Sequence, residues 1–303
     1  MNEIGPTTSA RLSGHVASQR NGPHFRKSAV RNGYASDSDR SWNELRRRAR
    51  IRLLRMHFES GVGHIGGNLS CLDLLLVLYH QVLEPADLFI LSKGHSAGAV
   101  YVTLWTLGKL SDEDLTSFHQ DSTLLSGHPP VSGIDDFLFA TGSLGHGLSL
   151  AAGLALAKRL KSEQGRVICL TSDAEWNEGS CWEALIFARH HKLTNLTVLV
   201  DLNGLQGFGT TRAVANLDPL ATKFEAFGFP TEEIDGHDAI AIKQAIETDR
   251  NEAAVIVAHT HKGCGVSFME DRMEWHYLPM TETQYLKAVE EIDQACETHS
   301  VRP

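Results

Sequence analysis

Two polar side chains, Asp173 and Asn203, each follow a short run of apolar residues. The first run is Val167–Leu170, the second is Leu196–Val200, and a helical pattern lies between them. This stretch predicts a strand, a crossover helix and a second, parallel strand. Because strands joined in this way end on the same edge of a sheet, we expect Asp173 and Asn203 to lie close together there.

The oxygen atoms of these two side chains suit a divalent cation. A single carboxylate, an amide oxygen and a nearby backbone carbonyl fit Mg²⁺ whose remaining ligands are phosphates and water. The helix that begins near Asn177 points its N-terminus at the same place, which favours a diphosphate. A second interpretation uses the same residues without a ligand: Asp173 caps the helix and Asn203 makes a turn. Spacing alone leaves both interpretations open.

Three histidines also follow short turns of small residues. His64 lies in a glycine-rich segment, His95 comes just after the apolar run Leu88–Leu91, and His128 follows Gly127. One such histidine is typical of an ordinary loop. Three at comparable positions favour a site that moves protons, because the histidine side chain titrates near neutral pH.

Hydrophobic periodicity predicts the elements that position these residues. Helical patterns cover residues 42–60, 72–83, 148–160, 218–227, 239–248 and 281–298, the last of exposed type. We expect Ser70 to cap the second of these helices. Short apolar runs predict further strands at 88–91, 231–234 and 253–258. Alternating strands and helices predict an α/β fold of three layers, α/β/α, with a mainly parallel sheet.

The ends of the chain and one charged helix carry less information. Residues 1–40 are rich in Ser, Gly, Asn and Arg, so we expect a disordered tail followed by one domain over residues 41–303. The arginines between positions 46 and 55 predict a solvated helix face. The central helix is expected to turn Trp182, Leu185 and Ile186 towards the core.

Composition excludes several classes of function. A net charge of −9 over 303 residues argues against general nucleic-acid binding. The five cysteines are scattered and form neither a zinc pattern nor a disulfide framework, which suits a reducing cytoplasm. We also expect no membrane span, because no apolar run approaches ~18 residues, and the N-terminus lacks the apolar core of a secretory signal.

Several motifs together resemble those of transketolases. The segment from Ser172-Asp173-Ala174 to Asn203 resembles the family's thiamine diphosphate motif, in which Gly-Asp-Gly precedes an Asn; both glycines are replaced here. The resemblance extends over residues 42–290 through four further segments: Gly63–Gly67, Ser92–His95, Gly142–Gly147 and Glu274–His276. The segment after the last strand resembles the family's Lys-Gly-Lys-Gly-Val, with Cys264 in place of the second lysine.

The resemblance implies particular roles for residues of this chain. Mg²⁺ would be held by Asp173, Asn203 and the backbone carbonyl of Leu205. Thiamine diphosphate would be contacted by His95, Gly142, Ser143, Leu144, Asp173, Ala174, Glu175, Asn203 and His261. Catalytic hydrogen bonding and proton transfer would fall to His64, His95, His128 and His276, and Glu178 would link two active sites across a dimer. Glu178 also fits a simpler role, as a first-turn carboxylate that complements the helix dipole.

A whole transketolase is about twice as long, so the resemblance implies the first half of a split enzyme. Such a half needs a C-terminal-half subunit, with an α2β2 assembly expected, and transfers a two-carbon ketol unit from a ketose to an aldehyde. Three alternatives stay open. They are a decarboxylating subunit of a 2-oxo-acid dehydrogenase, a specialised transferase with an unusual donor or a carrier acceptor, and a non-catalytic regulatory homologue.

Overall fold

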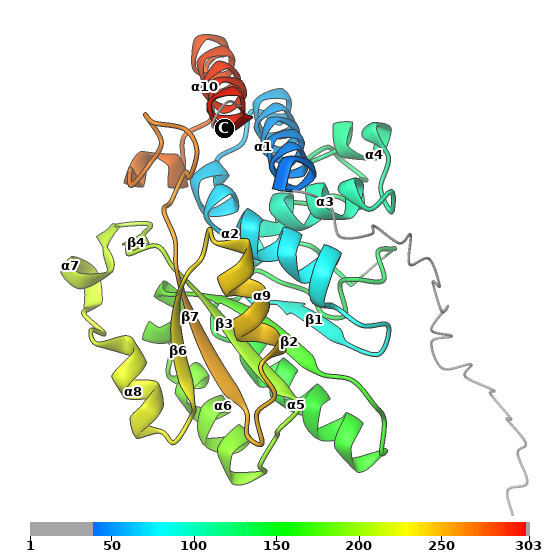
Figure 1. The fold of residues 1–303 in the computed structure, drawn as a ribbon, viewed down its shortest axis with the longest axis vertical. Coiled ribbons are helices and arrows are strands. Elements are labelled where there is room, and N and C mark those ends of the chain that lie inside the picture. The colour runs from blue at the N-terminus through cyan, green and yellow to red at the C-terminus, as the bar shows by residue number, and fades with distance from the viewer. Residues whose placement is uncertain (1–38, 132, 301–303) are drawn as a thin grey trace, which may run out of the picture. The chain divides into compact units, whose positions relative to one another are not determined.

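The computed structural model describes residues 39–131 and 133–300. Within them, five parallel strands form one sheet in the order β1-β2-β3-β7-β6 (Figure 1). The strands are β1 Leu88–Leu91, β2 Val167–Ser172, β3 Leu196–Leu202, β6 Thr231–Asp235 and β7 Ala254–His259. The expected strands are therefore confirmed, whereas the predicted tail falls almost wholly outside the described residues.

Helices cover both faces of this sheet. The core on one face contains residues of α1 (Asp39–Ser60), α2 (Ile65–Val77), α3 (Ala97–Thr106) and α9 (Ala239–Glu247), and α10 (Glu282–Ser300) extends this core by packing against α1. The other face packs against α5 (Gly147–Leu160), α6 (Gly179–His190) and α8 (Leu220–Ala226) (Figure 1). Strand side chains alternate between the two cores: Ile168 and Leu170 join the first, and Val167 and Cys169 join the second. The expected three-layer α/β/α fold is confirmed.

Helix α2 begins earlier than the sequence predicts. It starts at Ile65, directly after His64, whose backbone is left-handed with φ 66°. Ser70 therefore lies inside the helix, with its hydroxyl 3.0 Å from Gly67 O, and the prediction that it caps the helix is wrong. The turn of backbone at His64 starts the helix, and the glycines after it continue in helical conformation.

The same helix also corrects the expectation about apolar runs. Residues Ile65–Val82 form one helical stretch that is long and apolar enough to cross a membrane, judged by length and composition alone. In this fold 83% of that stretch is buried against other parts of the protein. Burial of this kind is typical of the core helix of a globular protein.

The arginines of α1 do not form a simply solvated face. Arg46 and Arg50 both bind the buried carboxylate of Asp73 on α2, at 2.9 and 2.6 Å. Burial opposes ionisation of Asp73, but Arg50, His237 and Arg46 outweigh it and hold its pKa well below the usual range. The arginines therefore join α1 to α2, a role that helical spacing alone does not reveal.

Two helices bury side chains differently from the prediction. On α6, Leu185 is buried and Trp182 is partly buried, but Ile186 is 57% exposed. On α10, for which the sequence predicts an exposed type, Ala288 and Ile292 are buried in the core shared with α1. In both cases the neighbouring element decides which stripe of the helix is covered.

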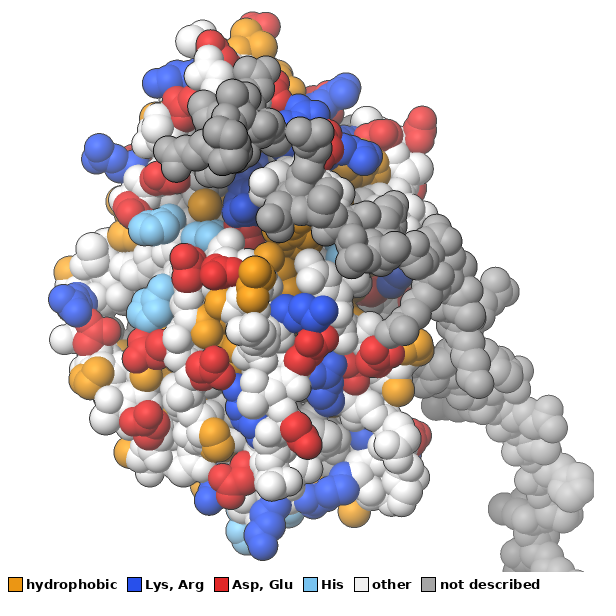
Figure 2. Space-filling view, in the orientation of Figure 1, with side chains coloured by type: hydrophobic (Ala, Val, Ile, Leu, Met, Phe, Trp, Pro, Cys, Tyr) orange, Lys and Arg blue, Asp and Glu red, His pale blue; other side chains and the backbone are white. Residues whose placement is uncertain are grey.

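Charges of both signs are mixed over the surface. Figure 2 shows Lys and Arg side chains interspersed with Asp and Glu over the described residues on this face. On this face the described residues form no basic stripe of the kind that nucleic-acid binding requires, and the net charge of the chain is −9.

Candidate active site

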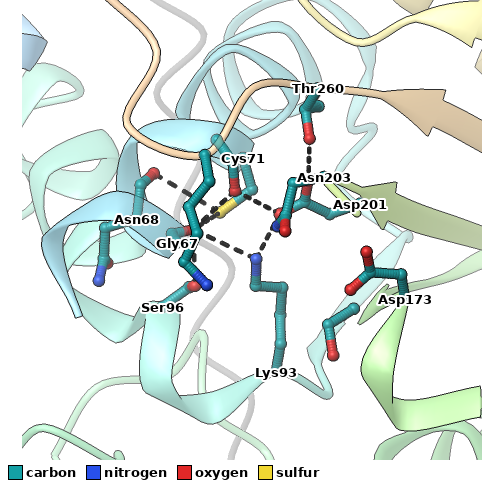
Figure 3. A network of polar contacts seen from close by, with 12 residues as sticks. Gly67, Asn68, Cys71, Lys93, Ser96, Asp173, Asp201, Asn203 and Thr260 are labelled. Atoms are coloured by element: carbon teal, nitrogen blue, oxygen red, sulfur yellow. Dashed lines mark hydrogen bonds and ion pairs between the residues drawn. The ribbon is translucent and has the colours of Figure 1, made fainter. Parts of the chain in front are cut away.

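A buried ion pair lies at the carboxyl edge of the sheet (Figure 3). Lys93 comes just after β1 and Asp201 lies near the end of β3, and both side chains are fully buried. Asp201 also accepts hydrogen bonds from Ser70 and Thr260, and Lys93 donates to Gly67 O. Burial opposes both charges, yet their mutual attraction holds the pKa of Lys93 above its ordinary value and that of Asp201 below. The network therefore joins α2 to the ends of β1, β3 and β7.

Asp173 and Asn203 meet at this edge, as the sequence predicts. The Asp173 carboxylate accepts hydrogen bonds from Ala174 N at 2.8 Å and from Gly204 N at 2.7 Å. The Asn203 amide oxygen accepts one from Leu205 N at 3.1 Å. The contacts expected for a helix cap and a turn are thus both present. The bond to Gly204 also places Asp173 directly against the loop that carries Asn203 and Leu205.

The environment of Asp173 fits a bound cation. Its carboxylate is buried, and among the described residues no lysine, arginine or histidine forms an ion pair with it. Burial, and then the nearby charge of Asp201, raise the pKa of Asp173 to about 7. A carboxylate in this position gains most from a divalent cation, which would restore its ionised form. The available carboxylate, amide and carbonyl oxygens are of the kind that Mg²⁺ prefers.

A glycine-rich loop lies against the segment that follows Asp173. Gly142, Ser143 and Leu144 are exposed, and the next residue, Gly145, has φ +81°. A Cβ at Gly145 would stand 2.6 Å from Glu178 Cβ, so only glycine fits this close approach. The loop is therefore held against the start of α6 and leaves its outer surface open to a ligand.

Glu175 holds the glycine-rich loop in place. Its fully buried carboxylate accepts hydrogen bonds from Gly145 N at 3.0 Å, from Ser172 N at 2.8 Å and from the Ser92 hydroxyl. These contacts occupy the side chain, so a contact from Glu175 to the cofactor would have to come from its backbone. Ala174, its neighbour, is partly buried and donates its N–H to Asp173.

The structure brings the predicted catalytic histidines together. The ring of His64 lies 5.7 Å from that of His95, 6.2 Å from that of His128 and 5.1 Å from that of His276. The rings of His95 and His276 are 5.8 Å apart. His64 N also donates to His276 O at 3.1 Å, which ties the left-handed turn to the segment after β7.

All four histidines are held in the neutral form near pH 7. Burial, and then neighbouring basic side chains, lower the pKa of His64 to about 4 and that of His276 to about 3. The pKa values of His95 and His128 are also lowered, in each case chiefly by burial. A neutral imidazole carries one donor and one acceptor nitrogen, so each ring can hydrogen-bond a hydroxyl and relay a proton.

Two predicted site residues lie apart from this cluster. His261 is exposed, pairs with Asp271 at 3.1 Å and stacks its ring on that of His237. Glu178 is exposed where α6 begins, so its link to a second active site stays a prediction.

Sequence reasoning missed Lys262. Burial alternates along the backbone after β7, and Lys262 is buried where His261 is exposed. Its ammonium lies 3.0 Å from His276 Nδ1 and 3.5 Å from Leu205 O. Burial and the charge of Lys93 lower its pKa to about 8.

Sequence reasoning also gave no role to Lys93 and Asp201. The sequence did indicate Asp201: it is an acidic residue at the end of an apolar run, and an acidic side chain buried there needs a buried partner.

Comparison with known proteins defines the family. Residues 48–295 match the family described as transketolase, thiamine diphosphate binding domain. The chain is 35% identical over 260 residues to one of the subunits of the apulose-4-phosphate transketolase of Phocaeicola vulgatus, with 82% of this chain and 92% of that protein covered. It is 33% identical over 246 residues to 6-deoxy-6-sulfo-D-fructose transketolase subunit SqwG of a Clostridium species, with 77% and 90% covered.

Longer transketolases match only in part. The chain is 33% identical to mouse transketolase over 256 residues, which are 81% of this chain but 41% of that protein. The structure of transketolase from Campylobacter jejuni superposes with a TM-score of 0.77 at 27% identity, covering 87% of this chain and 46% of the other.

The chain belongs to the transketolase family and corresponds to its N-terminal, thiamine diphosphate-binding half. The chain spans nearly the whole length of the relatives that are separate subunits. It is therefore a transferase subunit of the split type and not the counterpart of a complete single-chain enzyme. These relatives support the transketolase interpretation and not the 2-oxo-acid dehydrogenase alternative.

Replacing His95 with alanine should lower turnover more than it lowers cofactor affinity. The His95 ring faces His64 and His276, so its loss removes a proton-transfer and hydrogen-bonding group, worth about 100-fold or more in rate. Steady-state kinetics of the assembled enzyme and calorimetric titration with thiamine diphosphate would separate the two effects. The exposed His190 on α6 provides a matched control. Equal losses of turnover and affinity would instead assign His95 a structural role.

Proposed function

We propose that this chain binds Mg²⁺ and thiamine diphosphate and catalyses two-carbon ketol transfer together with a separate C-terminal-half subunit. The observation that carries this proposal is the buried, unpaired carboxylate of Asp173 beside Asn203 and Leu205, at the same sheet edge as four clustered histidines. The cofactor, when bound, would supply the nucleophilic and electron-accepting chemistry that ketol transfer needs. The chain supplies binding, orientation and proton transfer.

Each group of residues has a distinct part in this mechanism. Asp173, Asn203 and the carbonyl of Leu205 would hold the metal, and the exposed face of the loop Gly142–Leu144 would lie along the cofactor. Neutral His64, His95, His128 and His276 would hydrogen-bond the donor's hydroxyls and hold or move protons at those oxygens. Several polar partners at one place suit a hydroxylated sugar better than an unsubstituted 2-oxo acid.

The names of the relatives suggest a class of donor. Two of the similar subunits are named for apulose-4-phosphate and one for 6-deoxy-6-sulfo-D-fructose, which are ketoses with a terminal anionic group. We propose a donor of this class, with an aldehyde or a carrier-bound aldehyde as acceptor. A screen of ketose phosphates and sulfonates against one aldehyde acceptor, with the product followed by mass spectrometry, would rank them.

We further propose an α2β2 assembly in the cytoplasm. The support is indirect: two relatives that match over more than 90% of their length are named as subunits, whereas single-chain mouse transketolase is more than twice as long as the matched region. Four of the five cysteines, Cys71, Cys169, Cys181 and Cys264, are free thiols, which suits a reducing compartment.

Capture of the partner tests this proposal directly. The full chain, immobilised, should retain from its native lysate a protein of transketolase type that restores thiamine diphosphate- and Mg²⁺-dependent ketol transfer. The retained material would be sized by light scattering and its cofactor content measured. A homodimer that binds cofactor and turns over a ketose without any second protein would refute the split-enzyme proposal.

A further inference from the structure

Cys264, in the segment after β7, belongs to a cluster of side chains that the proposed mechanism leaves unused. Its sulfur, one ring nitrogen of His237 and one carboxylate oxygen of Asp73 all lie within 4.8 Å of one another. Arg50 borders the same cluster, with Nη2 at 3.8 Å from Cys264 Sγ and at 2.6 Å from Asp73 Oδ2. The cluster therefore joins α1, α2 and the segments that follow β6 and β7.

A cysteine, a histidine and an aspartate this close together could hold a metal ion, but their contacts argue against it. Both ring nitrogens of His237 are occupied: Nε2 accepts from His261 N at 3.0 Å, so the ring hydrogen lies on Nδ1 and is donated to Asp73 at 2.8 Å. The Asp73 carboxylate also binds Arg46 and Arg50. Two guanidinium groups would repel a divalent cation placed among them.

The charges of the cluster instead favour an anion at the sulfur. Arg46 and Arg50 carry two positive charges, and Asp73 balances one of them. Glu270, on the same segment as the sulfur, is exposed and accepts from Gly265 N at 2.9 Å, so water screens its charge. Arg50 is only 6% exposed, and its charge is screened much less. Positive charge beside a partly exposed cysteine favours the ionised sulfur, which is the reactive form.

Arg50 also has a donor that an oxygen atom on the sulfur would satisfy. Among the residues that the structure describes, its buried Nε has no hydrogen-bond acceptor. A Cβ added at Gly265 would stand 3.2 Å from this nitrogen, so Nε faces the backbone beside Cys264. Nε and Nη2 form the edge with which a guanidinium binds two oxygen atoms, and Nη2 already meets the sulfur. A buried donor without an acceptor is unfavourable, and an oxygen atom bound to Sγ would supply that acceptor.

Three other cysteines lie in the opposite kind of environment. Cys71, Cys169 and Cys181 are buried, whereas Cys264 is partly exposed. Burial raises the pKa of Cys71 to about 11 and that of Cys181 to about 12, and it raises the pKa of Cys169 well above the usual range. Because a buried, protonated thiol is a poor nucleophile, we expect reactions at sulfur to select Cys264 among these four.

We propose that Cys264 is a site of reversible oxidation by hydrogen peroxide and that Arg50 promotes the reaction. The ionised sulfur attacks one oxygen of the peroxide, so that an S–O bond forms and the O–O bond breaks. The sulfur loses two electrons and becomes a sulfenic acid, and the peroxide gains them and leaves as hydroxide, which takes a proton from the solvent. A low-molecular-weight thiol then condenses with the sulfenic acid to give a mixed disulfide and water, and a second such thiol restores Cys264.

Trapping of the sulfenic acid tests this proposal. The full chain would be treated with about equimolar hydrogen peroxide in the presence of dimedone, which labels sulfenic acids, and each cysteine peptide would be quantified by mass spectrometry. Cys264 should carry at least about ten-fold more label than Cys71, Cys169 or Cys181. A small thiol added before the dimedone should remove the label. Labelling of Cys264 no greater than that of the buried cysteines would overturn the proposal.

Replacing Arg50 separates the effect of its charge from that of mere exposure. In Arg50→Met the labelling of Cys264 should slow by about 10-fold, because an opposite charge this close favours the ionised sulfur by at least that factor. Arg50→Lys keeps the charge and should recover most of the rate. Unchanged labelling in Arg50→Met, or an equal loss in both variants, would overturn the role of Arg50. The selectivity measured in the wild type decides the oxidation site whether or not Arg50→Met folds.

Arg55→Met is the matched control for these variants. Arg55 also lies on α1, but its side chain is 55% exposed and pairs with Glu59 at 2.7 Å. Its replacement should leave the labelling of Cys264 unchanged.

A metal at the cluster would give a different result. The zinc content of the purified chain would be measured before and after the change Cys264→Ser. One zinc ion per chain that is lost in this variant, together with a Cys264 that peroxide leaves unlabelled in the wild type, would assign the cluster to a metal and overturn the proposal.

Discussion

Replacing Asp173 with alanine should weaken Mg²⁺-dependent binding of thiamine diphosphate by more than about 100-fold. Asp173 is the only carboxylate of the proposed metal site, and the loss of groups that merely support a metal ligand already costs about 10- to 100-fold. Titration of the assembled enzyme with cofactor at several Mg²⁺ concentrations would measure the effect. Asp87→Ala is a suitable control, because Asp87 is paired with Arg166 at the other end of β1 and β2.

The dependence on metal decides whether the assignment is correct. In the wild type the affinity for cofactor should rise with Mg²⁺ concentration, and in Asp173→Ala this rise should disappear. An affinity that stays unchanged, or that falls without losing its metal dependence, would show that Asp173 does not hold the metal.

In the cofactor-free protein, replacing Asp173 should be favourable: it should stabilise the folded chain, although it weakens cofactor binding. The pKa of Asp173 is about 7 in the folded chain and near 3.8 when unperturbed, so its ionisation opposes folding above pH 7. Asp173→Asn should therefore stabilise the metal-free chain at pH 8, by on the order of 2–4 kcal/mol. The gain should shrink as the pH falls from 7 towards 4, because the folded wild type takes up the proton that the unfolded chain still lacks.

Chemical denaturation at pH 8 and at pH 4.5 would check this effect. Asp173→Asn would then be more stable than the wild type in the absence of ligand, yet unable to bind the cofactor. Equal stability of wild type and variant at pH 8 would mean that the carboxylate already has a compensating partner.

The second large effect is expected from Lys93→Met. This change leaves the Asp201 carboxylate buried without its cation, which typically costs about 3–5 kcal/mol. In a domain of this size the melting temperature should fall by roughly 10 °C. Lys243→Met on the exposed side of α9 is the control, because its contact to Glu247 is a long surface pair at 4.0 Å.

A compensating variant makes this prediction specific. Lys93→Met combined with Asp201→Asn removes both charges and keeps an amide that Ser70 and Thr260 can still hydrogen-bond. The double variant should recover more than half of the lost stability. If the two changes were simply additive, the ion pair would not be the cause of the loss.

The layers of the fold were predictable from local patterns. The apolar runs at 88–91, 167–170 and 196–200 are short, flanked by polar turns and largely buried, which is the pattern of strands in a parallel sheet covered on both faces. Because parallel strands end at one edge, the meeting of Asp173 with the loop of Asn203 followed from the same pattern.

Other features depend on contacts that the pattern does not contain. The start of α2 at Ile65 depends on a left-handed backbone at His64, a conformation that residue type alone does not predict. The burial of Arg50 and the pairing of Arg46 depend on Asp73 of another helix. His261 and Lys262 are neighbours in the chain, and only the direction of the backbone after β7 decides that Lys262 is the buried one and His261 the exposed one.

The contacts of Glu175 have a consequence for how ligands would bind. Its carboxylate holds the amide of Gly145, in a loop, as firmly as the amide of Ser172, in a strand. We therefore expect amide hydrogen exchange at Gly145 to be as slow as in the strands, although neighbouring loop residues are exposed. A loop that is already ordered loses little conformational entropy on meeting its ligand. Ligand capture at this edge should then be limited by encounter rather than by rearrangement of the loop.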